Sequence, residues 1–180
     1  MLSRQRILDL FRKLDAELCR DGVRGDLFLV GGAAMTVAYD ARPATRDVDA
    51  IWHPTSEIRA AAGRVAERDD EIDDDWLNDA VKGFLPGDDR GTRRVVYDGD
   101  CLSVAAASPE YLLATKLLAS RVGRDEADIV LLYELCGFTT VEEGLDLLER
   151  YYPTRPVEAK VGFFVEGLLR RRAGEVEGGE

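Results

Sequence analysis

The sequence has little of what covalent or metal-held scaffolds need. It contains three cysteines and one histidine in 180 residues. Because Cys19, Cys101 and Cys136 are odd in number, far apart and never in a C-x-x-C pair, we expect neither structural zinc nor a disulfide framework. No apolar run approaches the ~20 residues of a membrane span, and residues 1–18 are charged and amphipathic, unlike a signal peptide. These absences favour a cytoplasmic protein.

Positive charge is also scarce. Lys and Arg number 24 against 35 Asp and Glu, which gives a net charge of −11. Because affinity for phosphate backbones comes from Lys and Arg, this balance argues against indiscriminate binding to nucleic acid. Many of the acidic residues lie in residues 67–75, which we expect to form a solvated helix face and loop. The basic residues gather elsewhere in the sequence, so the composition still allows a local basic cleft on an otherwise acidic protein.

Apolar spacing and turn-forming residues predict an α/β (α+β) fold. Apolar residues three and four apart predict a helix over residues 4–21. A short apolar run predicts a strand over residues 26–32, and β-branched and aromatic residues mixed with two acids predict a second strand over residues 47–52. Asp98-Gly99 predicts the tight turn of a later hairpin. From Ser108 onward, capping residues and helical spacing predict helices.

The order of these elements divides the chain. We expect a core of residues 1–107, with a small mixed β-sheet flanked by helices. Within it, residues 75–91 are expected to form a short helix and a loop. A helical C-terminal part of residues 108–172 is expected to pack on that core. Residues 173–180 are expected to be a flexible tail.

The stretch LVGGAAMTVAYDARPATRDVDAIW, residues 29–52, carries the chemistry. Side chains alternate across a strand, so Asp47 and Asp49 share one face with Cβ atoms ~6.6–7 Å apart. Carboxylates this close repel each other unless a cation lies between them, and Mg²⁺ is held by one or two carboxylates together with substrate phosphates. Gly31 and Gly32 leave backbone N–H groups that an anion can approach. The combination suits chemistry on a nucleoside triphosphate.

Each half of this pattern has an ordinary explanation when it is taken alone. D-x-D pairs occur at many solvated strand ends, and a glycine pair after a strand often marks only a turn. The glycines do not form a dinucleotide-binding fingerprint, because GGAAMT has no third glycine in place. The two halves together favour a site over either explanation.

The residues LVGGAAM…RPATRDVDAIW resemble the signature of the nucleotidyltransferase superfamily, which has the DNA polymerase β-like fold. That signature is a Gly-Gly or Gly-Ser turn, a helix, and D-x-D on the next strand. The R-x-x-T-x-D-x-D spacing, with YLLATKLLASRVGRDEADIVLL and DDDWLND downstream, looks closest to the bacterial AbiEii/MenT-type toxin nucleotidyltransferases and their relatives.

The resemblance implies roles for individual residues. Gly31 and Gly32 would contact the triphosphate of NTP, and Asp47 and Asp49 would bind Mg²⁺. The residues placed near phosphate would be Thr45, Arg46 or Arg42. A local hydrogen bond that caps the loop explains Thr45 equally well.

Three residues of the helical part extend this set. Lys116 lies ~40° round the predicted helix from Leu112, inside an apolar arc, so it either snorkels to the edge or faces a cleft. The resemblance implies that it contacts phosphate as a catalytic residue. Asp125 falls on the apolar face of the next helix, near its start, where capping explains it as well. Asp128 lies off that face, but with Asp125 it matches the family's D-x-x-D-I pattern, which implies a supporting role.

A third carboxylate, which the superfamily usually places on a later strand beside the first two, is not evident. The predicted strand CLSVAAAS has none, and Asp98 is expected in a turn, which leaves Asp100 if the strand begins early. Three functions therefore stay open. The first is Mg²⁺-dependent transfer of a nucleotidyl group from NTP to an acceptor such as tRNA, a protein or a small molecule, in a toxin–antitoxin setting. The second is a catalytically degenerate module that binds NTP as a regulatory, antitoxin-like partner. The third is a plain interaction domain.

Overall fold

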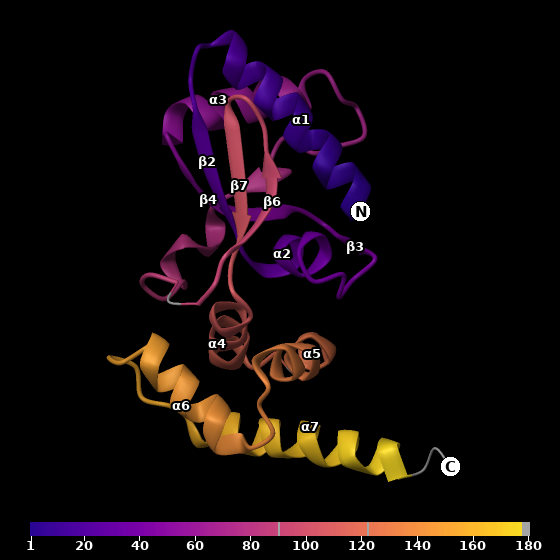
Figure 1. Ribbon diagram of the computed structural model, residues 1–180, viewed down its shortest axis with the longest axis vertical. Helices are drawn as coiled ribbons and strands as arrows, with labels where there is room; N and C mark the ends of the chain where they lie inside the picture. Colours follow the sequence, from indigo (N-terminus) through magenta and orange to yellow (C-terminus); the bar gives the residue numbers. More distant parts are fainter. Residues whose placement is uncertain (90, 122, 178–180) are drawn as a thin grey trace. The chain divides into compact units, whose positions relative to one another are not determined.

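The computed structural model describes residues 1–89, 91–121 and 123–177 and divides into two compact units (Figure 1). The first unit consists of Met1–Phe84 and Thr92–Ala107, and the second of Leu85–Gly91 and Ser108–Glu180. The described strands lie in the first unit, and the second contains helices. The predicted mixed α/β class is confirmed.

The first unit is built on a five-stranded mixed sheet of order β5-β4-β2-β7-β6. Its strands are β2 (Gly25–Leu29), β4 (Val48–His53), β5 (Leu77–Asn78), β6 (Arg94–Asp98) and β7 (Leu102–Ala106). β2 runs antiparallel to β4 and parallel to β7, and β4 runs parallel to β5. β6 and β7 form the antiparallel hairpin that Asp98-Gly99 predicts. A small separate sheet pairs β1 (Leu2–Ser3) with β3 (Ala44–Thr45).

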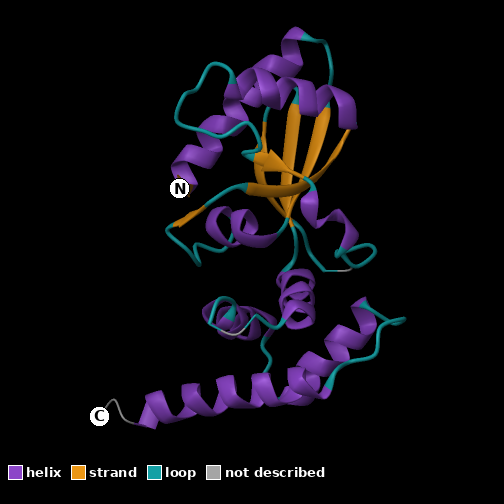
Figure 2. Cartoon of the chain, turned by 180° about the vertical axis from the view of Figure 1, so that it is seen from behind, coloured by secondary structure: helices purple, strands orange, loops and turns teal. Residues whose placement is uncertain are grey.

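One face of this sheet is the core of the unit. The helices α1 (Arg4–Arg20) and α3 (Thr55–Ala66) pack side by side and contact strands β7 and β4 (Figures 1 and 2). Along β4, Val48, Ala50 and Trp52 are buried, and the residues between them are not. Because strand side chains alternate, Asp49 lies on the face that is not the core.

Three local predictions in this unit need correction. The glycine pair, which the signature places in a turn before the helix, instead forms the first two residues of the short helix α2 (Gly31–Val37). Residues 75–91 contribute the strand β5 and the 3₁₀-helix η1 (Ala80–Gly83) where a short helix was expected. In the acidic stretch, Asp69 is buried and binds Arg6 and Lys13, each at 2.5 Å, so the solvated interpretation is wrong for this residue.

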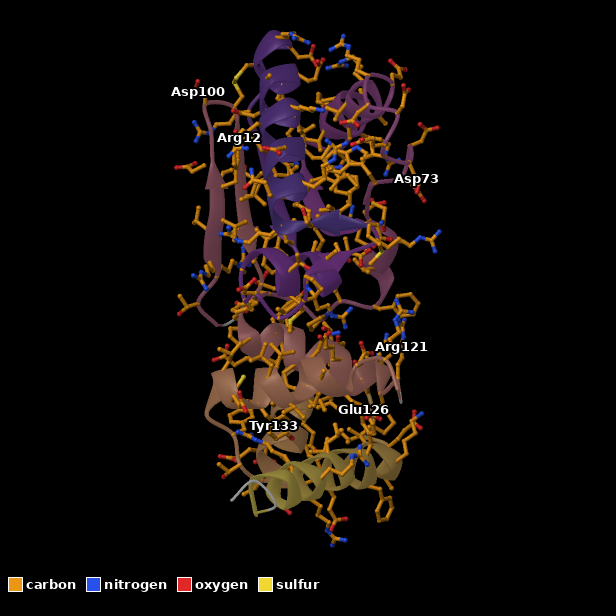
Figure 3. All side chains as sticks on the ribbon, turned by 90° about the vertical axis from the view of Figure 1, so that its right-hand side faces the viewer. Arg12, Asp73, Asp100, Arg121, Glu126 and Tyr133 are labelled. Atoms are coloured by element: carbon orange, nitrogen blue, oxygen red, sulfur yellow. A yellow bond between two sulfur atoms is a disulfide. The ribbon has the colours of Figure 1, made fainter. Side chains whose placement is uncertain are left out.

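A disulfide joins Cys19, near the end of α1, to Cys101, in the turn between β6 and β7, with their Cα atoms 5.4 Å apart. The Asp15 carboxylate lies beside it and accepts hydrogen bonds from the Cys101 N–H at 2.8 Å and the Tyr97 hydroxyl at 3.0 Å. Figure 3 shows this turn, where Asp100 is labelled. The expectation that no disulfide forms is wrong, because an 82-residue separation leaves no local spacing to recognise. Cysteine usage therefore gives no support to a cytoplasmic location.

Among the residues that the structure describes, the second unit contains four helices, and local capping residues set an end of three of them. Ser108 caps the first by accepting a hydrogen bond from Tyr111 N–H, Gly137 ends the second with φ +70°, and Thr140 and Glu143 form the capping box of the third. These helices are α4 (Pro109–Ala119), α5 (Glu126–Cys136), α6 (Val141–Tyr151) and α7 (Ala159–Glu177). Helix α7 extends into the predicted tail, whose last residues, 178–180, lie outside the described range. Within the described ranges, no helix has both the length and the apolar character needed to cross a membrane.

Candidate active site

The glycine pair and the two aspartates meet at one end of the sheet in the first unit. β2 ends at Leu29, and its antiparallel neighbour β4 begins at Val48, so these two strand ends lie together. The pairing continues one residue further, where Val30 N–H donates a 3.0 Å hydrogen bond to the Asp49 carbonyl. The turn into α2 therefore starts directly beside Asp49.

Each glycine makes room for one side chain of this site. Gly31 has φ +57°, and a Cβ there would lie 2.9 Å from Oδ2 of Asp49. A Cβ on Gly32 would lie 2.5 Å from the Thr45 hydroxyl oxygen. The structure thus brings together Gly31, Gly32, Thr45 and Asp49, which the sequence pattern assigns to one site. Any larger residue at either glycine would displace a side chain of the set.

The first backbone N–H groups of α2 have no side-chain cap. Val30 occupies the N-cap position and makes no capping hydrogen bond from its side chain. The first N–H groups of a helix have no intrahelical partner, so those of Gly31 and Gly32 are donors for a ligand. This donor pair lies beside the Asp49 carboxylate rather than on a remote surface, because the position of a Cβ on Gly31 is only 2.9 Å from Oδ2 of Asp49.

Both aspartates are half-buried oxygen donors. Asp47, which was predicted to begin the strand, lies in the bend one residue before β4, and Asp49 lies within β4. The Asp47 carboxylate makes no hydrogen bond or ion pair with the residues that the structure describes. Carboxylate oxygens are among the ligands that Mg²⁺ takes up in proteins. The residues present therefore fit a divalent cation.

The neighbouring polar residues differ in how they are placed. Thr45 is buried in β3, and its hydroxyl makes no hydrogen bond to any residue in the described ranges, so the loop-capping alternative has no support. Arg46 is exposed, and in the same ranges its guanidinium has no acidic partner. Arg42 is half-buried.

The D-x-D strand β4 has β2 on one side, and the strand on its other side is β5 rather than β7. In the sheet order, β2 separates β7 from β4, whereas β5 pairs directly with β4. The register places Asn78 opposite Asp49. The strand CLSVAAAS, where a third carboxylate was expected, is therefore not adjacent to the D-x-D strand, and the residue at the neighbouring position on β5 is Asn78. The sequence analysis did not single out Asn78, although the segment DWLND that contains it was part of the resemblance.

Asp100, the alternative third carboxylate, lies at the other end of the sheet. Gly25, at the start of β2, donates its N–H to the Cys101 carbonyl, so the hairpin turn that contains Asp100 adjoins the start of that strand. At about 3.3 Å per residue, the length of β2 separates this turn from Asp49 by roughly 13–17 Å. Asp100 is therefore not part of the candidate site.

The predicted Lys116, Asp125 and Asp128 form a buried cluster in the second unit. The ammonium nitrogen of Lys116 lies 2.9 Å from Oδ1 of Asp125 and 2.5 Å from Oδ2 of Asp128. The three residues are only 9%, 6% and 3% exposed, respectively. Asp125 occupies the N-cap position of α5 without a side-chain capping bond, so pairing with Lys116 replaces the capping explanation. The prediction that Asp128 lies off the buried face is wrong, because its carboxylate faces the same ammonium.

Comparison with known proteins gives the chain a family. Residues 5–152 match the model of DUF6036, described as a nucleotidyltransferase of unknown function. The match includes both glycines, both aspartates and the Lys116 cluster, and it ends before α7. Neither the curated proteins nor the solved structures gave a match. Because the family model covers most of its length, the chain belongs to the DUF6036 family of nucleotidyltransferases of unknown function.

Proposed function

We propose that this protein is a Mg²⁺-dependent nucleotidyltransferase that uses NTP. The observation that carries the proposal is the contact between the Gly31–Gly32 turn and Asp49, in a chain of a nucleotidyltransferase family. In the proposed reaction, an acceptor oxygen attacks the α-phosphorus of NTP, and the bond to the β-phosphate oxygen breaks. Pyrophosphate leaves, and the proton of the acceptor is released to water.

Each residue of the first-unit site has a part in this reaction. Asp47 and Asp49 hold the metal ion and align the attacking oxygen. Bound Mg²⁺ supplies positive charge against the phosphates. The N–H groups of Gly31 and Gly32 donate to phosphate oxygens, where fixed donors stabilise developing charge. Thr45 and Arg46 contribute a hydroxyl and a positive charge near the phosphates.

The acceptor and the biological setting rest on the resemblance to toxin nucleotidyltransferases. A short RNA end, such as that of tRNA, is the first acceptor to test, followed by a protein side chain. A toxin–antitoxin setting would add a cognate partner protein. Because NTP is the substrate, the proposed location is the cytoplasm.

The test is transfer of label from NTP. Purified protein is incubated with each α-labelled NTP, Mg²⁺ and either total tRNA or cell lysate, beside Asp47→Asn, Asp49→Asn and the control Asp26→Asn. Asp26 is an exposed carboxylate near the start of β2, at the end of the sheet away from the site. We expect wild type and Asp26→Asn to label a macromolecule and both site variants to lose at least 100-fold. Labelling that persists in Asp47→Asn and Asp49→Asn would refute the proposed site.

A second candidate is a degenerate module of the same fold that binds NTP without turnover. The observation that favours it is the neutral Asn78 beside Asp49, at the position next to the D-x-D strand. This candidate predicts Mg²⁺-dependent binding of NTP that Asp49→Asn abolishes, with no release of pyrophosphate in the presence of any acceptor. Measuring binding and pyrophosphate release on the same samples separates the two functions.

A further inference from the structure

Asn78 shares a face of the sheet with Asp49. Neighbouring parallel strands in register point paired side chains to the same face, and the register pairs Val48 with Leu77 and Asp49 with Asn78. Burial agrees with this assignment: Val48 and Leu77 are buried in the core, whereas Asp49 and Asn78 are both half-buried on the other face. Asp49 is therefore flanked by the Gly31 turn on one side and by Asn78 on the other.

The amide of Asn78 is held in place. Val48 N–H donates a 2.7 Å hydrogen bond to the Trp76 carbonyl, which fixes the chain just before Asn78 to β4. The buried Trp76 in turn donates from its indole nitrogen to the Ala62 carbonyl at 3.2 Å. On the other side, Oδ1 of Asn78 accepts a 3.2 Å hydrogen bond from Ala80 N–H at the start of η1.

In this arrangement the oxygen of the Asn78 amide accepts a hydrogen bond, and the nitrogen of the amide is available to donate to a ligand. A carboxamide has one acceptor oxygen and two N–H donors. Among the residues that the structure describes, none accepts a hydrogen bond from Nδ2 of Asn78. Beside Asp49, Asn78 therefore offers donors without charge, where a third carboxylate would offer acceptors and a negative charge.

We propose that Asn78 makes this a one-cation site, in which its amide donates to a phosphate oxygen of the nucleotide instead of binding metal. The inference rests on the proposed function. Asp47 and Asp49 supply carboxylate oxygens for one divalent cation, whereas a second cation beside Asp49 would have to lie against the N–H donors of Asn78, which repel it. In two-metal sites the second ion helps to stabilise the attacking and leaving oxygens, and a carboxylate at the position of Asn78 would be its natural ligand.

The number of bound ions tests the proposal without activity. Mn²⁺ is titrated into the full chain with a non-hydrolysable NTP analogue, and free Mn²⁺ is counted by electron paramagnetic resonance. We expect one Mn²⁺ per wild-type chain and two per chain in Asn78→Asp, which adds a carboxylate of the same shape. Asn78→Ala should keep one Mn²⁺ and bind the analogue about tenfold more weakly, because it loses a hydrogen bond to a charged group.

The control variants separate failure of this inference from failure of the proposed function. Asp26→Asn should bind Mn²⁺ and the analogue as wild type does, and Asp49→Asn should lose the bound Mn²⁺. Thermal unfolding should confirm that every variant is folded. Two ions in wild type, or Asn78 variants that change neither the ion count nor the nucleotide affinity, overturn the role of Asn78 and leave the proposed function standing. Absence of Mn²⁺ binding in wild type overturns both.

Discussion

Gly31 combines two constraints that rarely coincide at one residue. Its positive φ of +57° disfavours any side chain, and the space where a Cβ would lie is within 2.9 Å of the Asp49 carboxylate. We predict that Gly31→Ala costs about 1–2 kcal/mol of stability from the left-handed backbone alone. We also predict that it lowers Mg²⁺-dependent nucleotide binding at least tenfold, because Asp49 must move. Chemical denaturation and nucleotide titration measure the two effects.

Gly22 offers a matched control for this change. It has a similar φ of +67°, and nothing lies within 4 Å of the position of its Cβ. Gly22→Ala should therefore show the same loss of stability with unchanged nucleotide binding. If both variants bind nucleotide as wild type does, the contact between Gly31 and Asp49 has no part in the site.

Lys116 is the predicted catalytic residue to which the structure gives a second role. Its ammonium group bridges α4 to α5 by pairing with Asp125 and Asp128. We predict that Lys116→Met costs about 3–5 kcal/mol in denaturant unfolding, because two buried carboxylates lose their cation. The triple variant Lys116→Met/Asp125→Asn/Asp128→Asn should recover most of that loss, because no buried charge is left unpaired.

The same triple variant tests the catalytic role of Lys116. The two aspartates take two of the three donors of the Lys116 ammonium group. We expect transfer from NTP to stay impaired after stability is recovered. Full activity in the stable triple variant would make the cluster purely structural.

At the scale of elements, local signals predicted what lies close in sequence. The ends of α4, α5 and α6 follow from Ser108, Gly137 and the Thr140–Glu143 pair, each of which satisfies backbone groups within a few residues. The glycine turn and D-x-D were predicted to meet for the same reason, since only α2, a short loop and the two-residue strand β3 separate them.

Elements that form only through distant partners escaped prediction. β5 has two residues and exists because Val48 and Asp49 pair with it, so no periodicity in its own sequence reveals a strand. Asn78 was missed with it. The disulfide between Cys19 and Cys101 and the burial of Asp128 likewise depend on contacts between elements. Topology, rather than composition, decided all of these.

Asp69 ties the segment after α3 to α1 and makes that junction sensitive to acid. Hydrogen bonds from Lys13 and then from Arg6 lower the pKa of this carboxyl below its ordinary value of 3.8. A lowered folded-state pKa means that the stabilisation is present above pH 3.8 and is lost as the pH falls through the folded value. We predict that Asp69→Asn lowers stability at pH 7 and flattens its fall below about pH 4.

Urea unfolding from pH 7 to pH 2.5 measures this effect. Asp70→Asn is the control, because Asp70 is the exposed neighbour of the buried Asp69. The control should follow the wild-type curve at every pH. A wild-type acid dependence that survives unchanged in Asp69→Asn would show that other carboxylates carry it.

At the scale of the whole molecule, charge limits the acceptor. The chain carries a net charge of −11, and its densest basic run is already paired with acidic residues. Within that run, Arg170 pairs with Glu166, Arg171 with Glu126 and Arg172 with Glu134. Helix α7, which contains the run, also lies beyond the part of the chain that matches the family. The run therefore serves to hold helices α7 and α5 together more than to bind phosphates.

This balance predicts weak binding to long nucleic acids. Affinity for duplexes grows with the number of phosphates that Lys and Arg neutralise, and falls with salt in proportion. Arg170→Gln/Arg172→Gln should leave transfer to a short RNA end unchanged and lower thermal stability slightly.

We expect no saturable binding of a 30-base-pair duplex below about 10 µM protein in 150 mM salt, measured by fluorescence anisotropy, in contrast to typical nonspecific binders. Tight, steeply salt-dependent binding to the duplex would instead mean that a basic surface outweighs the acidic body, and would make a long nucleic acid the acceptor to pursue.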